Sequence, residues 1–226
     1  MTTTRITFEA KSGAPASGEL TEPAGAGKAP GVLLIQEWWG LNDHIRSLAK
    51  RLADAGFLVL SPDLYHGVVT TDPAEAAGLM TALDGERSMD ELKGAFAFLA
   101  AHEGCSGKVG VIGFCMGGAF AFRAAANIAE LGAAVPFYGV PPAASAPYAA
   151  VKCPVLAHVA SRDEWVPVAK VEAIREQIQA AGGQMEVCVY EADHAFVNDT
   201  RPEVYSPDDA KRAWERSIAF LHEHLG

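Results

Sequence analysis

The chain has few cysteines, fewer basic than acidic side chains, and no long apolar run. Its four cysteines are never spaced as CxxC, which argues against a zinc ribbon, a thioredoxin motif and a disulfide scaffold. The apolar runs are far shorter than the roughly 20 residues that cross a bilayer. Residues 1–5 lack the apolar core of a signal peptide. These absences predict a cytoplasmic protein with free thiols.

The charge balance excludes further partners. Lysine and arginine total 18 and aspartate and glutamate total 28, so the net charge is −10. A nucleic-acid binder needs a basic face, and binding to anionic membranes needs basic clusters. We therefore expect neither a nucleic-acid nor a membrane partner, and the acidity is interpreted as a contribution to solubility.

The pattern of apolar runs indicates the fold class. The length of 226 residues suits one domain, residues 1–226. Short aliphatic runs predict buried strands at 32–35, 57–60, 108–113, 134–138, 154–159 and 185–190. Longer alanine-rich or amphipathic stretches between them predict helices near 42–56, 73–82, 87–103, 116–130, 167–181 and 207–225. This alternation is typical of an α/β protein with three layers: a mostly parallel central sheet and helices on both faces.

Two segments fall outside this alternation. Residues 5–9 are expected to form an antiparallel edge strand. Residues 139–152 are rich in proline and alanine and could form a lid or a plain surface loop. The loop is favoured, because connections of this length are commonly nothing more.

In an open parallel sheet, ligands bind beyond the carboxyl ends of the strands. The strand at 108–113 runs into Gly113-Phe114-Cys115-Met116-Gly117-Gly118, and a helix follows. This is the strand–turn–helix context of a nucleophile elbow, with cysteine in place of serine. The helix N-terminus would favour a thiolate, and the backbone N–H of Met116 would point at an oxyanion.

Two further strands end in residues that complete such a site. Asp163 follows the strand at 154–159, and His194 follows the strand at 185–190. Taken singly, Cys115 could be a buried apolar residue, Asp163 a turn residue and His194 an ordinary loop histidine. The order nucleophile, acid, histidine is that of the α/β-hydrolase fold, and it favours the catalytic interpretation of all three.

The segment Gln36-Glu37-Trp38-Trp39-Gly40 follows the strand at 32–35, where this fold places its second oxyanion donor. The N–H of Trp38 is the candidate. Glu37 is unusual there, because a carboxylate would repel an oxyanion unless it is paired or protonated. Composition alone favours a solvated glutamate.

Together these motifs make the sequence resemble the dienelactone hydrolase (carboxymethylenebutenolidase) family. The resemblance extends over roughly residues 5–225. It depends on the segments already named and on Pro62-Asp63-Leu64-Tyr65, Tyr138-Gly139 and His194-Ala195-Phe196. The cysteine elbow together with the Gln-Glu motif is specific to this family within the fold.

The resemblance implies a function and roles for the residues. Family members cleave lactones or esters through an acyl-thiol intermediate, so Cys115 would be the nucleophile, His194 the base and Asp163 the residue that orients it. The glutamate matching Glu37 contacts the resting thiol in the family and is proposed to take its proton when substrate binds. The resemblance also implies that the protein is a monomer.

The sequence departs from the family in its substrate contacts. Dienelactone-cleaving members hold the substrate carboxylate with two arginines, one of them four residues after the catalytic histidine. That position is Asn198 here, and the nearest arginine is Arg201. The segment 66–85, where the other arginine is expected, has neither arginine nor lysine, which leaves Arg87 as the first candidate. Cleavage of dienelactone itself is therefore doubtful.

The remaining candidates for substrate contact are Trp39, Tyr138 and Phe196, together with Asn198. The tryptophan pair, Trp38 and Trp39, could form an apolar pocket wall or simply pack in the core. His222 and His224 lack further ligands, so no metal is expected, and no cofactor is expected either.

The function expected from the sequence is hydrolysis of small-molecule lactones or esters by a cysteine nucleophile. Two alternatives stay open. One is a thioesterase on the same fold, and the other is a non-catalytic binding or redox-sensing member of the family.

Overall fold

The computed structural model describes residues 2–25, 27–142 and 146–226. Its centre is an eight-stranded sheet in the order β1-β2-β4-β3-β5-β6-β7-β8. The strands are β1 (Thr2–Glu9), β2 (Pro15–Glu22), β3 (Ala29–Ile35), β4 (Leu58–Pro62), β5 (Cys105–Phe114), β6 (Ala133–Phe137), β7 (Val155–Ala160) and β8 (Met185–Tyr190). From β4 to β8 every pairing is parallel, and the pairings of β2 with β1 and with β4 are antiparallel.

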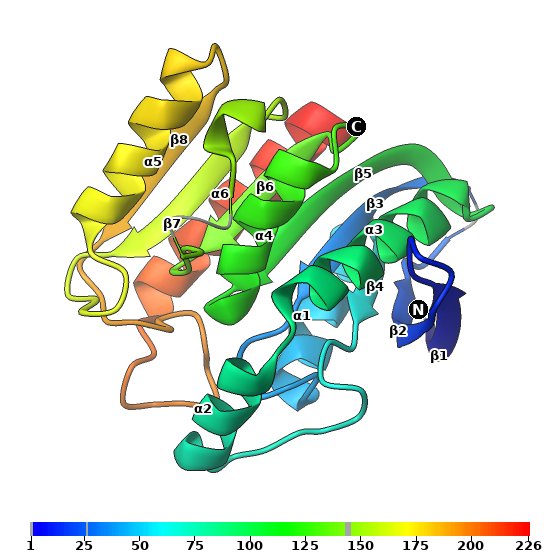
Figure 1. Cartoon of the computed structure of the whole chain (residues 1–226), viewed down its shortest axis with the longest axis horizontal. Coiled ribbons are helices and arrows are strands. Elements are labelled where there is room, and N and C mark those ends of the chain that lie inside the picture. Colours follow the sequence, from blue (N-terminus) through cyan, green and yellow to red (C-terminus); the bar gives the residue numbers. More distant parts are fainter. Residues whose placement is uncertain (1, 26, 143–145) are drawn as a thin grey trace.

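Helices cover both faces of this sheet (Figure 1). They are α1 (Asp43–Asp54), α2 (Pro73–Ala82), α3 (Gly85–Ala101), α4 (Met116–Asn127), α5 (Val168–Ala180) and α6 (Pro207–Leu225). Apolar residues of α3, α4 and α5 form one core with the sheet, and those of α1 and α6 form a second core on the other face. The predicted three-layer α/β-hydrolase arrangement is therefore confirmed.

The N-terminal hairpin was only half predicted. The antiparallel edge strand is β1, but its partner β2 was not recognised in the sequence. β2 alternates buried and less buried positions, with Ala16, Gly18 and Leu20 facing inward. It also pairs with Ser61 and Pro62, so β4 continues two residues beyond the strand predicted at 57–60. This pairing partner lies more than 35 residues away, and local pattern does not reveal it.

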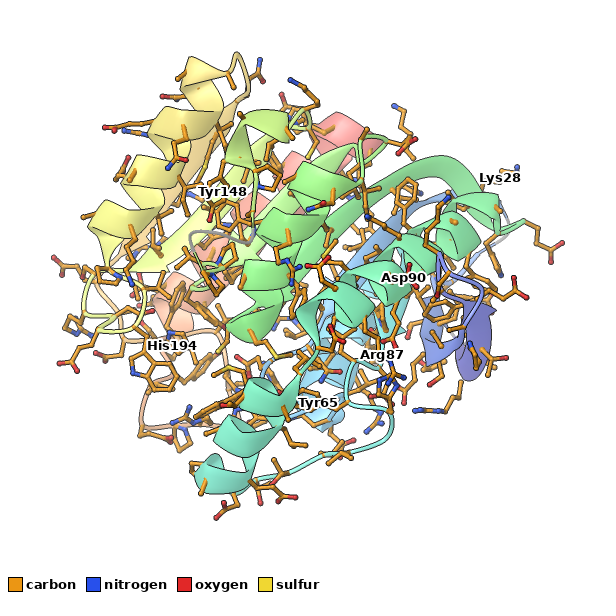
Figure 2. All side chains as sticks on the ribbon, viewed as in Figure 1. Lys28, Tyr65, Arg87, Asp90, Tyr148 and His194 are labelled. Carbon is orange, nitrogen blue, oxygen red and sulfur yellow. The ribbon has the colours of Figure 1, made fainter. Side chains whose placement is uncertain are left out.

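The strands β3, β5, β7 and β8 run in the same direction, so their carboxyl ends meet at one edge of the sheet. Figure 2 shows His194 at this end and Lys28, which precedes β3, at the opposite end. The helix α2 lies beyond the same edge, away from the sheet (Figure 1), and Ala76 is its one buried residue. This edge is where the predicted site residues gather.

The connection between β6 and β7 contains a short 3₁₀ helix, η2 (Tyr148–Ala150). Residues 143–145, part of the segment expected to be a plain loop, lie outside the described residues. The described remainder is not a plain surface loop, because Tyr148 is buried and packs edge-on against Phe122 of α4.

Candidate active site

Cys115 occupies the sharp turn between β5 and α4. Its φ is +54°, a conformation that side chains other than glycine rarely adopt. The turn is fixed by its own backbone, since the Cys115 N–H donates to the Phe137 carbonyl at 3.1 Å and its carbonyl accepts from Ala119 N–H at 3.2 Å. The thiol therefore stands at the N-terminus of α4 in a strained, well-supported position.

The glycines around this turn are required by close backbone contacts. A Cβ on Gly113 would strike the Gly117 carbonyl, and a Cβ on Gly139 would strike the carbonyl of Cys115. A Cβ on Gly117 would strike the carbonyl of Ile35 at the end of β3. Side chains at these three positions would therefore collide with neighbouring backbone.

His194 and Asp163 are joined by a hydrogen bond. His194 Nδ1 lies 2.7 Å from Asp163 Oδ2, and the other carboxylate oxygen accepts the backbone N–H groups of Trp165 and Val166 at 2.9 and 3.0 Å. Burial would raise the pKa of Asp163, but the hydrogen bond and charge of His194 and the two backbone donors hold it below its ordinary value. Asp163 is therefore a buried anion that fixes the imidazole ring.

The second ring nitrogen of His194 is buried on the side of the thiol. Among the described residues Nε2 has no hydrogen-bond partner of good geometry, but Cys115 is close enough to affect the titration of the ring. Burial lowers the pKa of His194, whereas Asp163 and Cys115 raise it to a net value of about 10. The site thus favours the protonated, positively charged form of the His194 ring, which lies between Asp163 and the sulfur.

Glu37 is buried, and its hydrogen bonds among the described residues go to side chains other than the thiol. Its Oε2 accepts a hydrogen bond from Asn198 Nδ2 at 2.7 Å, and Tyr138 donates a long one of 3.5 Å to Oε1. These two described side chains, Glu37 and Cys115, share no hydrogen bond. Burial raises the pKa of Glu37, against the lowering effects of His44, Asn198, His194 and Arg201.

The two predicted oxyanion donors lie on the elements expected. Met116 is the first residue of α4, so its N–H has no acceptor within the helix. Trp38 lies in the loop after β3, and Gly117 packs against the carbonyl at the start of that loop. Their role in oxyanion binding stays a prediction.

An aromatic cluster borders the thiol. The rings of Trp38 and Trp39 meet at 4.9 Å, and Trp38 meets Trp165 at 5.4 Å. Trp165 lies 5.2 Å from the His194 ring and is 56% exposed. The sequence analysis missed Trp165, because the sequence does not reveal that this ring is exposed beside the histidine.

Two predicted substrate contacts are corrected by the structure. Phe196 is fully buried against Tyr138 and Tyr190, at 5.6 and 5.0 Å between ring centroids. Asn198 is 1% exposed and is occupied by Glu37. Both side chains are buried and line neither cavity, so they pack behind the residues that do. Tyr138 and Trp39 do line cavities.

Two cavities meet at Cys115, Trp165 and His194. The smaller, of about 490 Å³, has a mixed wall that includes Glu37, Trp38, Trp39, Arg162, Glu164, Asp193 and Arg201. The larger, of about 800 Å³, is mainly apolar and lies between α4, α5 and the segment after β6. A substrate bound across the thiol would therefore meet walls of different chemistry on its two sides.

Comparison with known proteins agrees with this geometry. A sequence model of the "Dienelactone hydrolase family" matches residues 17–225. The chain belongs to the dienelactone hydrolase family. It is 36% identical to "Protein usf" of Aquifex pyrophilus and 35% identical to a "Putative carboxymethylenebutenolidase" of Aquifex aeolicus (strain VF5), in each case covering 97% of this chain and 98% of the relative.

A solved structure shows the same architecture. The crystal structure described as a "Putative Dienelactone Hydrolase" from Klebsiella pneumoniae subsp. pneumoniae MGH 78578 has a TM-score of 0.85 and 29% identity, covering 98% of this chain and 99% of that one. This dienelactone hydrolase family member is thus a hydrolase of the carboxylic ester class.

The structure places the two candidate arginines, Arg87 and Arg201, in different surroundings. Arg87 is not available, because it pairs with Glu91 at 2.9 Å and lines neither cavity (labelled in Figure 2). Arg201 lines the smaller cavity, with its guanidinium 5.7 Å from the Trp39 ring, and Arg162 lines it too. Sequence spacing did not single out Arg162.

Two classes of site are not indicated in the parts of the chain that the structure describes. There, no group of three or more histidine, cysteine, aspartate or glutamate side chains is placed to hold a metal ion. No helix within residues 2–25, 27–142 and 146–226 is long and apolar enough to cross a membrane.

Replacing Gly117 with alanine should destabilise the elbow. The new Cβ would meet the carbonyls of Ile35 and, at 2.6 Å, Gln36, so the backbone would have to shift. We expect Gly117→Ala to lower the free energy of unfolding by about 1–3 kcal/mol in urea denaturation. Gly78→Ala is the matched control: its Cβ meets open space within α2, so about 0.5–1 kcal/mol of stabilisation is expected. Equal effects of the two substitutions would contradict this account.

The raised pKa of Glu37 predicts a pH-dependent effect of Glu37→Gln. Because the folded pKa lies above the ordinary 4.5, the folded state holds this proton more tightly than the unfolded state. Wild-type stability should fall relative to the variant as pH rises from about 4.5, by about 1.4 kcal/mol for each unit of the shift. Thermal melts of both proteins between pH 4 and pH 8 measure the gap.

The exposed Glu203 supplies the control of opposite sign. Its pKa is lowered by a backbone hydrogen bond and by Arg201, so its contribution to stability is lost as pH falls. Glu203→Gln should therefore become less stable than wild type, not more stable, as pH rises. A gap for Glu37→Gln that shrinks with rising pH would show that Glu37 is not held in its protonated form.

Proposed function

We propose that this protein hydrolyses small esters or lactones through a thioester on Cys115. The observation that supports this most directly is the hydrogen-bonded pair His194–Asp163 beside a thiol on a strained strand-to-helix turn. A nucleophile, a base within its reach and a third group that orients the base form the general constellation for covalent catalysis. Membership of a hydrolase family supports the same reaction class.

The thiol proton of Cys115 would already reside on His194 in the resting site, because the raised pKa of the imidazole favours its charged form. The sulfur of Cys115 then attacks the ester carbonyl, and the N–H groups of Met116 and Trp38 stabilise the oxyanion. As the tetrahedral intermediate collapses, the carbon–oxygen bond to the alcohol breaks and His194 returns the proton to it. The acyl group stays on Cys115 as a thioester. His194 next takes a proton from water, which attacks the thioester and releases the acid and the thiol.

Asp163 would hold His194 in the tautomer with the proton on Nδ1, leaving Nε2 to serve the sulfur. Its lowered pKa keeps it ionised through the cycle, so it stabilises the imidazolium without taking the proton. This positioning role is consistent with its two backbone hydrogen bonds, which fix the carboxylate independently of the histidine.

Glu37 is less suited to be the first proton acceptor. Its Oε2 is occupied by Asn198, and a proton relay through Glu37 would have to break that contact. Its raised pKa favours the neutral form, which removes the repulsion that an ionised carboxylate would exert on the oxyanion. We therefore assign the thiol proton to His194 and a supporting role to Glu37. A thioester substrate would use the same steps.

Replacing Cys115 with alanine should abolish turnover of a neutral aryl acetate. We expect kcat/KM to fall at least about a thousandfold, because removal of one member of such a set disables the others. Cys153→Ala is the control, since that buried thiol lies outside both cavities and should leave turnover unchanged. With a slowly deacylated ester, intact mass spectrometry should detect an acyl-enzyme in the wild type and none in Cys115→Ala. Unchanged hydrolysis by this variant would overturn the cysteine mechanism.

Arg201 should matter for an anionic substrate and not for a neutral one. A carboxylate beside this guanidinium gains a charge-assisted hydrogen bond, so Arg201→Met should lower kcat/KM for dienelactone about tenfold or more. Hydrolysis of the aryl acetate should change less than about threefold. Arg87→Met, which alters neither cavity, should change neither substrate. Equal losses on both substrates would assign Arg201 to general structure instead.

A further inference from the structure

One face of α4 forms the floor of the larger cavity. Met116, Ala119, Phe120 and Arg123 all line it, and they have the i, i+3, i+4, i+7 spacing of a single helical stripe. The stripe begins next to Cys115 and ends at Arg123, eight positions along the helix, which corresponds to ~12 Å of rise. An apolar path thus leads from the thiol to one guanidinium.

The charged side chains of this wall are all of one sign. Arg123 and Lys170 are cationic, His194 adds a positive charge when it is protonated, and the described lining includes no carboxylate. The chain as a whole carries a net charge of −10, and the smaller cavity mixes both signs. A cationic cavity in an acidic protein is complementary to an anionic ligand.

Arg123 is the better placed of the two cations. It is 8% exposed, whereas Lys170 lies at the exposed rim. Its Nη2 donates to Glu86 at 2.7 Å, and its Cζ lies 5.3 Å from the Phe120 ring. Its Nε is buried without a hydrogen-bond partner among the described residues. Because buried donors are normally satisfied, this unpaired N–H shows that the hydrogen-bonding capacity of the guanidinium is not filled.

The one hydrogen-bond partner that the described residues give to the Arg123 guanidinium is readily displaced. The side chain of Glu86 is 90% exposed, so its pairing with Arg123 competes with water. A carboxylate that entered through the cavity could bind the free edge of the guanidinium while Glu86 stayed in place or swung away. The planar fork of arginine suits such two-oxygen recognition.

We propose that the larger cavity binds the acyl chain of esters whose apolar chain ends in a carboxylate, and that Arg123 binds this terminal group. The proposal rests on the function proposed above. The acyl group is the part that bonds to Cys115, and the apolar stripe begins at the next residue, so the chain would lie along α4. Hydrolysis of such an ester would release a dicarboxylic acid.

The test compares two esters that differ only at the end of the chain. The p-nitrophenyl ester of suberic acid carries a free carboxylate on an eight-carbon chain, and p-nitrophenyl octanoate does not. Arg123→Met retains an unbranched apolar side chain and should lower kcat/KM for the suberate ester at least about tenfold. Turnover of the octanoate ester should change less than about threefold. Arg175→Met, on α5 but lining neither cavity, is the matched control.

A second substitution should strengthen binding of the suberate ester, and misfolding would not produce such a gain. Glu86→Gln removes the carboxylate that competes for Arg123, so KM for the suberate ester should fall while that for the octanoate ester stays the same. The shorter p-nitrophenyl hydrogen succinate should not reach Arg123, and neither variant should alter its turnover. The proposal would be overturned if both variants changed the turnover of the suberate ester no more than that of the octanoate ester.

A binding measurement separates this site from the catalytic mechanism. Calorimetry with suberate and octanoate on Cys115→Ala needs no turnover. Suberate binding that weakens about tenfold on adding Arg123→Met supports the site, even where no ester is cleaved and the catalytic proposal fails. If the wild type cleaves esters but suberate affinity does not change on adding Arg123→Met, the catalytic proposal stands and this binding site is rejected.

Discussion

The close crossing of backbone around Cys115 is the constraint on which the rest of the site depends. A positive φ at a cysteine is unfavourable, and it persists because β3, β6 and the start of α4 press on the turn from three sides. Gly117 and Gly139 permit that approach because they have no Cβ. The position of the sulfur is thereby set by the sheet rather than by side-chain packing. Asp163 follows β7 and His194 follows β8, so both residues are placed relative to a sulfur whose position is already fixed.

Two buried carboxyl groups lie near the same histidine, and their surroundings move their pKa values in opposite directions. Asp163 accepts hydrogen bonds from His194 and from two backbone N–H groups, which outweigh its burial. Glu37 has the amide of Asn198 and a long contact with Tyr138, which do not outweigh its burial. The number and charge of the donors decide which carboxyl stays ionised. One acid can therefore orient the imidazole while the other lies beside the oxyanion loop without repelling it.

The sequence was sufficient to predict what depends on strand ends, and insufficient for what depends on distant packing. Cys115, Asp163 and His194 each follow a strand, and a parallel sheet must bring such positions to one edge. Asn198 was expected to touch substrate because of its spacing from His194, yet its partner is Glu37, 161 residues away. Neither β2 nor the exposed ring of Trp165 follows from local pattern, because pairing with β4 and the position of a loop are tertiary properties.

The walls rather than the reacting groups distinguish one substrate from another here. Cys115 and His194 line both cavities, so these two groups give no preference to either side. Arg201 on one side is already paired with Glu203 and shares its wall with carboxylates, which weakens its attraction for an anion. Arg123 on the other side is buried, has a spare donor and is surrounded by apolar groups, and the low local polarity strengthens its attraction. The terminal carboxylate of a long acyl chain should therefore be directed along α4, and the orientation of such a substrate across the thiol follows from that difference.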